Sequence, residues 1–192
     1  MPLTGNKVII ITAPSGSGKT SITRHLLKTF HDQLAFSISA TTRQKREQET
    51  DGLDYYFISV KEFEEKIKQD AFVEWEMVYE GKYYGTLKSE IRRIWENNKA
   101  PLLDVDVQGA VHIQQQFPDN SLTLFIEPPS IEELKKRLEQ RGTETAESLS
   151  ARINKASFEL TFKKHFDKVV VNDDLDTASK KAEEIVKEFL ML

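Results

Sequence analysis

The clearest chemical signal in this sequence is a glycine-rich run that ends in lysine and threonine. Residues 13–20 read APSGSGKT, which matches the G-x-x-x-x-G-K-[ST] phosphate-binding loop at every position except the first. The backbone N–H groups around Gly16 and Gly18 can point at phosphate oxygens. Lys19 can bridge the β- and γ-phosphates, and the hydroxyl of Thr20 can reach a Mg²⁺ ion. The run therefore predicts a site for a nucleoside triphosphate and its metal.

A second group of anion-binding residue types follows in the segment SISATTRQKREQETDGLDYYF, at residues 37–57. Arg43 and Arg46 supply guanidinium forks, and Tyr55 and Tyr56 supply phenol donors. This combination suits a phosphate group. Together with the glycine-rich loop, the segment predicts two anion sites and therefore two phosphorylated ligands.

The elements on both sides of the loop are those that a phosphate loop requires. Residues 7–12 (KVIIIT) form a β-branched run without alternation, which is typical of a strand buried on both faces of a parallel sheet. From Lys19 to Phe30 apolar residues recur at helical spacing, which predicts an amphipathic helix. Ala13 replaces the first glycine of the pattern, and its methyl group fits if the backbone there has a negative φ.

The alternation of strand and helix continues toward the C-terminus. Further strands are expected at 101–107, 122–126 and 168–172, with helices between them. Ser130 and Glu133 form a capping box at the start of one helix, and an apolar stripe over 178–189 indicates a closing helix. This rhythm predicts a parallel sheet that is covered by helices on both faces.

Two segments depart from this rhythm. Residues 37–86 contain short alternating runs such as DYYFIS and FVEWEMVYEG, which predict an inserted, partly antiparallel lobe. Residues 137–164 are strongly charged and place Gly142 between polar residues, which predicts a mobile hairpin of helices.

The composition excludes several classes of protein. Of the 192 residues, 39% are hydrophobic and 30% charged, as expected for one globular domain. The net charge of −4 argues against a nucleic-acid partner. With no cysteine there is no disulfide, zinc–thiolate site or cysteine nucleophile, and a reducing compartment is expected. No apolar run reaches signal-peptide or transmembrane length, so we expect a cytoplasmic protein with no membrane partner.

A phosphate loop alone leaves GTPases, ATPase motors and small-molecule kinases open. Residues 37–57 distinguish among these classes, because they resemble in full the guanylate kinase hallmark S-x-S-x-T-T-R-x-x-R-x-x-E-x-x-G-x-D-Y-x-F. The resemblance continues through YYGT at 83–86, LDVDVQG at 103–109 and VNDDLD at 171–176, and it covers nearly the whole chain. Two positions depart from it, Ala13 for glycine and Thr86 for the serine of some members.

The resemblance implies transfer of the γ-phosphoryl group of ATP to GMP, with Mg²⁺ as cofactor. The implied ATP-binding residues are Ala13, Pro14, Ser15, Gly16, Ser17, Gly18, Lys19, Thr20, Asn172 and Asp173. The implied GMP-binding residues are Ser39, Arg43, Arg46, Tyr55, Glu74, Tyr84, Gly85, Thr86, Asp104 and Asp106. The implied catalytic residues are Lys19, Arg43, Arg137, Arg141 and Arg152, and the implied metal ligands are Thr20 and Asp106.

The chemistry of guanine agrees with this assignment. Its N1–H and exocyclic amino group are adjacent donors, so the carboxylate of Glu74 can accept from both, and the hydroxyl of Thr86 can donate to O6. Adenine presents an acceptor at N1 and would leave that carboxylate unpaired. Asp104 and Asp106 lie two apart on an expected strand and so face the same side. The alternative for Asp106 is to cap a helix that begins near Gln108.

We therefore predict an α/β P-loop NTPase core with a five-stranded parallel sheet flanked by helices, in one guanylate kinase-like domain over residues 5–188. The predicted parts are a core (5–36, 87–136 and 165–192), a mixed-sheet GMP-binding lobe (37–86) and a helical lid (137–164). The alternative function is a catalytically inactive guanylate-kinase-like module that binds phosphopeptides, and the intact loop with its lid arginines argues against it. The segment around Arg43, together with Glu74, argues against a kinase that acts on AMP or dTMP. We also expect the protein to accept dGMP as a second phosphoryl acceptor. We expect it to be a monomer or a homodimer.

Overall fold

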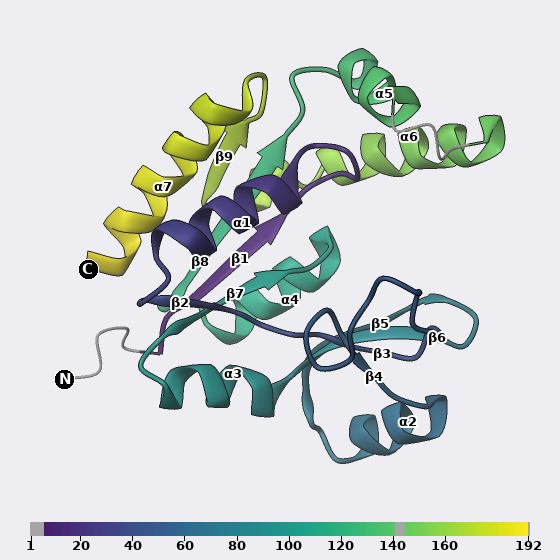
Figure 1. Ribbon diagram of the computed structural model, residues 1–192, viewed down its shortest axis with the longest axis vertical. Helices are drawn as coiled ribbons and strands as arrows, with labels where there is room; N and C mark the ends of the chain where they lie inside the picture. Colours follow the sequence, from purple (N-terminus) through teal and green to yellow (C-terminus); the bar gives the residue numbers. More distant parts are fainter. Residues whose placement is uncertain (1–5, 141–144, 192) are drawn as a thin grey trace.

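The computed structural model describes residues 6–140 and 145–191 (Figure 1). Its central sheet has five parallel strands in the order β2-β7-β1-β8-β9. Their bounds are β1 Val8–Thr12, β2 Leu34–Phe36, β7 Ala100–Asp104, β8 Ser121–Glu127 and β9 Lys168–Val171. The predicted five-stranded parallel sheet of a P-loop NTPase core is thereby confirmed.

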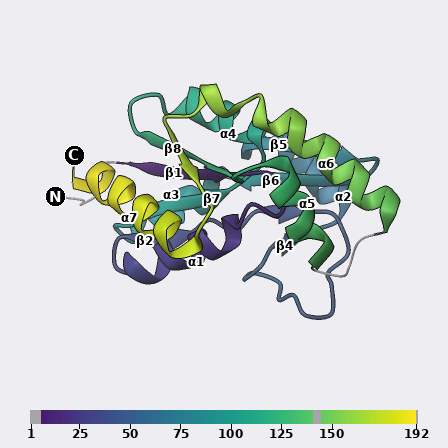
Figure 2. The same cartoon turned by 90° about the horizontal axis from the view of Figure 1, so that it is seen from above.

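Alternate residues of β1 enter two separate hydrophobic clusters, one on each face of this sheet. Ile9 and Ile11 pack with α1 (Lys19–Thr29) and α7 (Leu175–Met191). Val8 and Ile10 pack with α3 (Lys88–Glu96) and α4 (Val107–Gln116). Figure 2 shows α1 and α4 on opposite sides of the sheet. Because both faces are covered, β1 buries side chains in both directions, which explains the unbroken apolar run from Val8 to Ile11.

A second sheet of four strands has the order β4-β3-β6-β5 and contains both parallel and antiparallel pairs. Its strands are β3 Ala40–Thr41, β4 Tyr56–Phe57, β5 Phe72–Tyr79 and β6 Lys82–Leu87. The helix α2 (Val60–Lys68) covers it through Phe63, whose ring stacks on Phe72 at 4.3 Å between centroids. Ser59 caps this helix, since its hydroxyl accepts from the backbone N–H of Glu62.

The helices α5 (Ile131–Gln140) and α6 (Ala146–Leu160) pack on each other through Leu134, Leu138 and Ala156. The 3-10 helix η1 (Lys163–His165) then leads into β9. In Figure 1 the α5–α6 pair and the second sheet lie on two sides of the end at which β1 and β7 finish. Both are therefore placed to reach residues that follow those strands. Within the described ranges, no helix has the length and apolar character needed to cross a membrane.

The strand that follows α3 is shorter than the sequence predicted. The strand predicted over 101–107 ends at Asp104, because Asp106 caps α4 and accepts from the backbone N–H groups of Gln108 and Gly109 at 3.1 and 2.8 Å. Asp104 and Asp106 therefore do not share the face of one strand. The cap predicted at Ser130 is present, since its hydroxyl accepts from the backbone N–H of Glu133.

Candidate active site

The glycine-rich loop joins the end of β1 to the start of α1. Gly16 and Gly18 adopt φ values of 96° and 87°, a region that other residue types avoid, and Gly18 is the N-cap of α1. Ala13 does not have a positive φ, so its methyl group fits in the position where the phosphate-loop pattern has glycine. The first turn of α1 thus opens onto the loop with backbone N–H groups and a positive helix end, as an anion site requires.

Asn172, directly after β9, binds the backbone of this loop. Its side-chain Nδ2 donates to the backbone carbonyl of Ser17 at 2.7 Å, and the asparagine is buried. A Cβ atom on Gly18 would lie only 2.1 Å from the same Nδ2. Asn172 therefore fixes the backbone of the loop, and its contact with the nucleotide stays a prediction.

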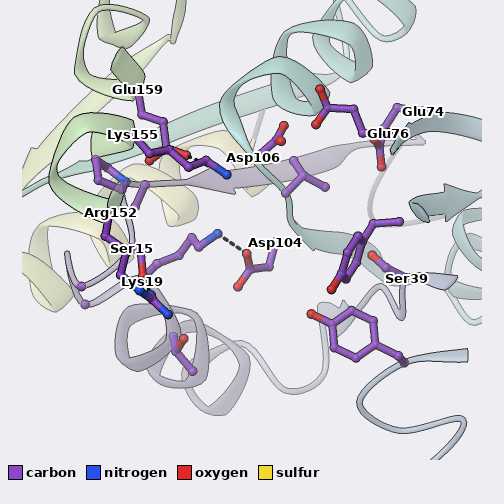
Figure 3. A pocket seen from close by; sticks show the side chains of 18 of the residues that line it. Ser15, Lys19, Ser39, Glu74, Glu76, Asp104, Asp106, Arg152, Lys155 and Glu159 are labelled. Carbon is purple, nitrogen blue, oxygen red and sulfur yellow. Dashed lines mark hydrogen bonds and ion pairs between the residues drawn. The ribbon is translucent and has the colours of Figure 1, made fainter. Parts of the chain in front are cut away.

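A cavity of about 530 Å³ opens beside the loop (Figure 3). Its walls come from the loop, the end of β7, the four-stranded sheet and α6. The predicted site residues that line it are Ala13, Pro14, Ser15, Gly16, Gly18, Lys19, Thr20, Ser39, Tyr55, Glu74, Tyr84, Gly85, Asp104, Asp106 and Arg152. The fold thus brings most of the residues predicted for the two phosphorylated ligands to one cavity.

Lys19 and Asp104 form an ion pair across the centre of this cavity (Figure 3). The pair links the start of α1 to the end of β7, because Lys19 is the first residue of α1 and Asp104 pairs in register with Ile11 of β1. The carboxylate therefore orients the ammonium group toward the space in front of the loop. A phosphate group that enters this space would compete with Asp104 for Lys19.

The lid arginines lie on two sides of the loop. Arg152, on α6, donates to the hydroxyl of Ser15 at 2.7 Å and faces the first cavity. Arg137, on α5, donates to the carbonyls of Asn172 and Asp173 at 3.0 and 3.3 Å. A second cavity of about 380 Å³ lies there, lined by Gly16, Gly18, Ser21, Arg137, Gln140, Asn172, Asp173 and Leu175. Arg141 lies outside the described residues.

Arg43 is held rigidly next to the tyrosines that line the first cavity. Its guanidinium binds both oxygens of Glu49, at 2.5 and 2.6 Å, and lies 4.9 Å from the ring centroid of Tyr55. This contact lowers the pKa of the Glu49 carboxyl to about 2. Tyr55 in turn meets Tyr84 edge to face at 6.0 Å. Neither Arg43 nor Arg46 is among the residues that line the cavity; Arg43 is half-buried behind Tyr55, whereas Arg46 is exposed.

The far end of the cavity holds a group of carboxylates. Thr86 donates its hydroxyl to Oε1 of Glu74 at 2.7 Å, yet burial raises the pKa of Glu74 to about 7. Glu76, two residues along β5, shares a hydrogen bond with Asp106 that, together with burial, raises the pKa of Glu76 to about 8. Burial opposes ionisation of Asp106, but the hydrogen bonds from Glu76 and from the N–H of Gly109 hold its pKa below the usual range.

Sequence reasoning missed several polar residues at this site. Glu49 occupies the glutamate position of the hallmark segment, so its presence was visible but its bond to Arg43 was not. Glu76 lies two positions after Glu74, which places both carboxylates on one face of a strand. Lys155 and Glu159 follow Arg152 on α6 at helical spacing and also line the cavity. Periodicity could have indicated Glu76, Lys155 and Glu159, since each repeats the face of a residue already singled out.

The oxygen ligands available for a cation are few. Among the described residues there is no group of three or more His, Cys, Asp or Glu side chains that could hold a metal ion. Thr20 is exposed at the start of α1 and lines the cavity, whereas Oδ1 of Asp106 already accepts two backbone N–H groups. A metal at this site would take most of its ligands from nucleotide phosphates and water. That is how Mg²⁺ is commonly bound in phosphoryl-transfer enzymes, so the residues fit it.

Comparisons with known proteins identify one family over nearly the whole chain. The guanylate kinase family model matches residues 5–189. A guanylate kinase of Bacteroides fragilis is 47% identical over 96% of this chain and 90% of its own length. That of Porphyromonas gingivalis is 46% identical over 96% of this chain and 98% of its own. Among solved structures, the guanylate kinase of Anaplasma phagocytophilum has a TM-score of 0.74 and 25% identity, covering 97% of this chain and 87% of that one.

Proposed function

The chain belongs to the guanylate kinase family, and we propose from this premise how its two cavities carry out ATP:GMP phosphoryl transfer. The reaction moves the γ-phosphoryl group of ATP to the phosphate of GMP and gives ADP and GDP. The proposal depends above all on one observation, that a single cavity joins the glycine-rich loop to Tyr55, Tyr84 and Glu74. GMP-dependent formation of ADP is the experiment that tests it.

In this proposal ATP binds along the loop with its phosphates toward the first cavity. The N–H groups at Gly16 and Gly18 and the ammonium of Lys19 face those phosphates, and Arg152 approaches them from α6. The adenine end lies in the second cavity, beside Arg137, Asn172 and Asp173. The two cavities share the loop glycines, which supports one ligand that passes over the loop from one to the other.

GMP binds in the same cavity from the side of the four-stranded sheet. Its phosphate lies against Arg43, Tyr55 and Tyr84, with Arg46 reaching it from the exposed turn. Its base lies against Glu74, whose carboxylate accepts from the hydroxyl of the buried Thr86. Thr86 does not line the cavity, so its donation to O6 of guanine stays a prediction. Ser39, Gly85 and the aspartates Asp104 and Asp106 complete the walls around the base and the ribose.

Transfer between these ligands needs no general base, because the attacking atom is already a phosphate oxygen. Catalysis therefore consists of alignment and of neutralising the charge on the moving phosphoryl group. Lys19 and Arg152 face that charge from the donor side, and Arg43 faces it from the acceptor side. Closure of α6 against the four-stranded sheet would exclude water, which could otherwise hydrolyse ATP.

Thr20 and one of the two aspartates are the protein groups that would hold Mg²⁺, which supplies charge neutralisation between the β- and γ-phosphates. Asp104 is the aspartate whose carboxylate binds only Lys19 in the described contacts, whereas Asp106 caps α4. Asp106 as a direct ligand, as the sequence suggested, stays a prediction.

We expect a chelator of divalent cations to stop ADP formation completely. Without the metal, the charge on the β- and γ-phosphates is neutralised only by Lys19 and the arginines. The measurement is a coupled ADP assay before and after addition of EDTA, with excess Mg²⁺ restoring the rate as control. Turnover at an unchanged rate in EDTA would contradict the metal requirement.

Arg43→Ala should weaken GMP binding much more than ATP binding. The guanidinium lies 4.9 Å from the ring centroid of Tyr55, which meets Tyr84, and a hydrogen bond between charged groups is worth about 1.5–3 kcal/mol, or roughly 10- to 150-fold in Kd. Calorimetric titration with each nucleotide measures both affinities. Arg92→Ala, which removes the same charge from an exposed position on α3, is the control. Equal losses for GMP and ATP would show that the two anion sites are misassigned.

Several finer points remain predictions within this proposal. They are dGMP as a second acceptor, a monomeric or homodimeric state, a cytoplasmic location and the residue limits of core, lobe and lid. The inactive phosphopeptide-binding module has no observation in its favour. The first cavity contains the glycine-rich phosphate loop as well as the residues proposed to bind GMP. A module that only binds phosphopeptides does not need the phosphate loop.

A further inference from the structure

Gly109, in the first turn of α4, lies directly against the carboxylate of Glu74. A Cβ atom placed on Gly109 would be 3.0 Å from Oε2 of Glu74 and 3.4 Å from its Cδ. It would also be 3.4 Å from Oδ1 of Asp106. Close carbon–oxygen contacts are ordinarily about 3.3–3.6 Å, so a methyl group here would press on the Glu74 carboxylate. Because Gly109 has no side chain, the Glu74 carboxylate has room to lie against the helix at this position.

The backbone of α4 does not itself require glycine at this position. Four other described glycines have positive φ, but Gly109 does not. A helix with ordinary φ favours alanine over glycine. The backbone N–H of Gly109 donates to Oδ1 of Asp106 at 2.8 Å, and an alanine N–H can do the same. Helix formation alone thus favours alanine, and the requirement for glycine comes from Glu74.

The two oxygens of Glu74 are constrained by different elements. Oε1 accepts from the hydroxyl of Thr86 on β6, and Thr86 is buried. Oε2 lies toward Gly109 and the first turn of α4, whose positive end favours a carboxylate. A methyl group at position 109 would push Oε2 while Thr86 still held Oε1. The carboxylate would then turn out of its present plane.

We propose that Gly109 is a positioning residue for GMP: by lacking a side chain, it lets Glu74 present both oxygens to the base in one plane. Guanine offers N1–H and its amino group side by side, so a turned carboxylate keeps only one good hydrogen bond. Gly109 itself lines neither of the two cavities. This inference rests on the proposed function, because that proposal assigns the base to Glu74.

The test is Gly109→Ala, assayed with GMP and AMP and by thermal unfolding. The KM for GMP should rise about tenfold, the loss expected for one hydrogen bond, and the GMP:AMP ratio of kcat/KM should fall with it. The KM for ATP should not change, and the Tm should equal or exceed that of the parent protein. Gln115→Ala, on an exposed position of the same helix, is the matched control and should leave every value unchanged. A lower Tm with equal losses for ATP and GMP would overturn the positioning role.

A double-mutant cycle with Glu74→Gln then tests whether Gly109 acts through Glu74. Losses that do not add would support the proposal, and additive losses would overturn it. Reduced selectivity in Glu74→Gln but parent-like selectivity in Gly109→Ala would overturn the role of Gly109 alone. Unchanged selectivity in Glu74→Gln would instead overturn the assignment of the base to Glu74, and the role of Gly109 would be rejected with it.

Discussion

Lys19→Ala should abolish phosphoryl transfer while leaving the fold intact. The ammonium of Lys19 lies at the centre of the first cavity, held by Asp104, and faces the space in front of the loop. A single cation on a transferring phosphoryl group is worth about a thousandfold or more in rate. Because Lys19 is partly exposed and belongs to no hydrophobic cluster, we expect little change in Tm.

The measurement is kcat for ADP formation, beside a thermal unfolding curve for each variant. Lys28→Ala removes an exposed lysine from the last turn of the same helix and is the matched control. In Lys19→Ala the carboxylate of Asp104 loses its partner, which could affect the rate by itself. The double variant Lys19→Ala/Asp104→Asn removes this unpaired charge, so it reports the loss of the cation alone. It should be as inactive as the single variant. Activity within a few-fold of the parent protein in either variant would contradict the role of the loop.

Glu74→Gln should change which base the protein accepts. The substitution keeps the shape of the side chain but places an NH₂ group where, in the proposed complex, one carboxylate oxygen faces a donor of guanine. GMP should lose about 2–3 kcal/mol of transition-state stabilisation, roughly a 30- to 150-fold fall in kcat/KM. AMP, whose N1 can accept from that NH₂, should lose little or improve.

The quantity that decides this prediction is the ratio of kcat/KM for GMP to that for AMP. Glu65→Gln, on the exposed face of α2, is the control for a change of one charge in the same part of the chain. Thr86→Val is a second variant, because it removes the hydroxyl that orients Glu74 and should lower the ratio in the same direction. A ratio unaltered by Glu74→Gln would move the search for base recognition to Ser39, Thr86 and Asp104.

The local features of the fold were predictable from the sequence because they depend on neighbouring residues. The strand before the loop, the loop itself and the helix after it follow from apolar runs, glycines and helical spacing over residues 7–30. The end of β7 was not predicted correctly, because the cap formed by Asp106 competes with strand continuation. Two patterns overlapped there, and the hydrogen bonds of the helix N-terminus determined the outcome.

The remaining features of the site depend on contacts between residues far apart in the chain. The sequence predicted that Arg137 and Arg152 are both catalytic, but it did not indicate that Arg137 donates to the carbonyl of Asn172 and Arg152 to the hydroxyl of Ser15. The contact between Gly109 and Glu74 joins α4 to β5 and leaves no periodic signal in either segment. Such contacts require the relative placement of whole elements, which spacing rules within one segment do not specify.

The most direct test of this account is a coupled assay of ADP formation with ATP, Mg²⁺ and one acceptor at a time from GMP, dGMP, AMP and UMP. The cavity joins the glycine-rich loop to Glu74, the carboxylate that we propose pairs with the N1–H and amino group of guanine. We therefore expect rapid ADP formation with GMP, with dGMP also accepted, and rates with AMP and UMP lower by about two orders of magnitude or more. Equal rates with all four acceptors, or ADP formation that does not depend on an acceptor, would contradict the account.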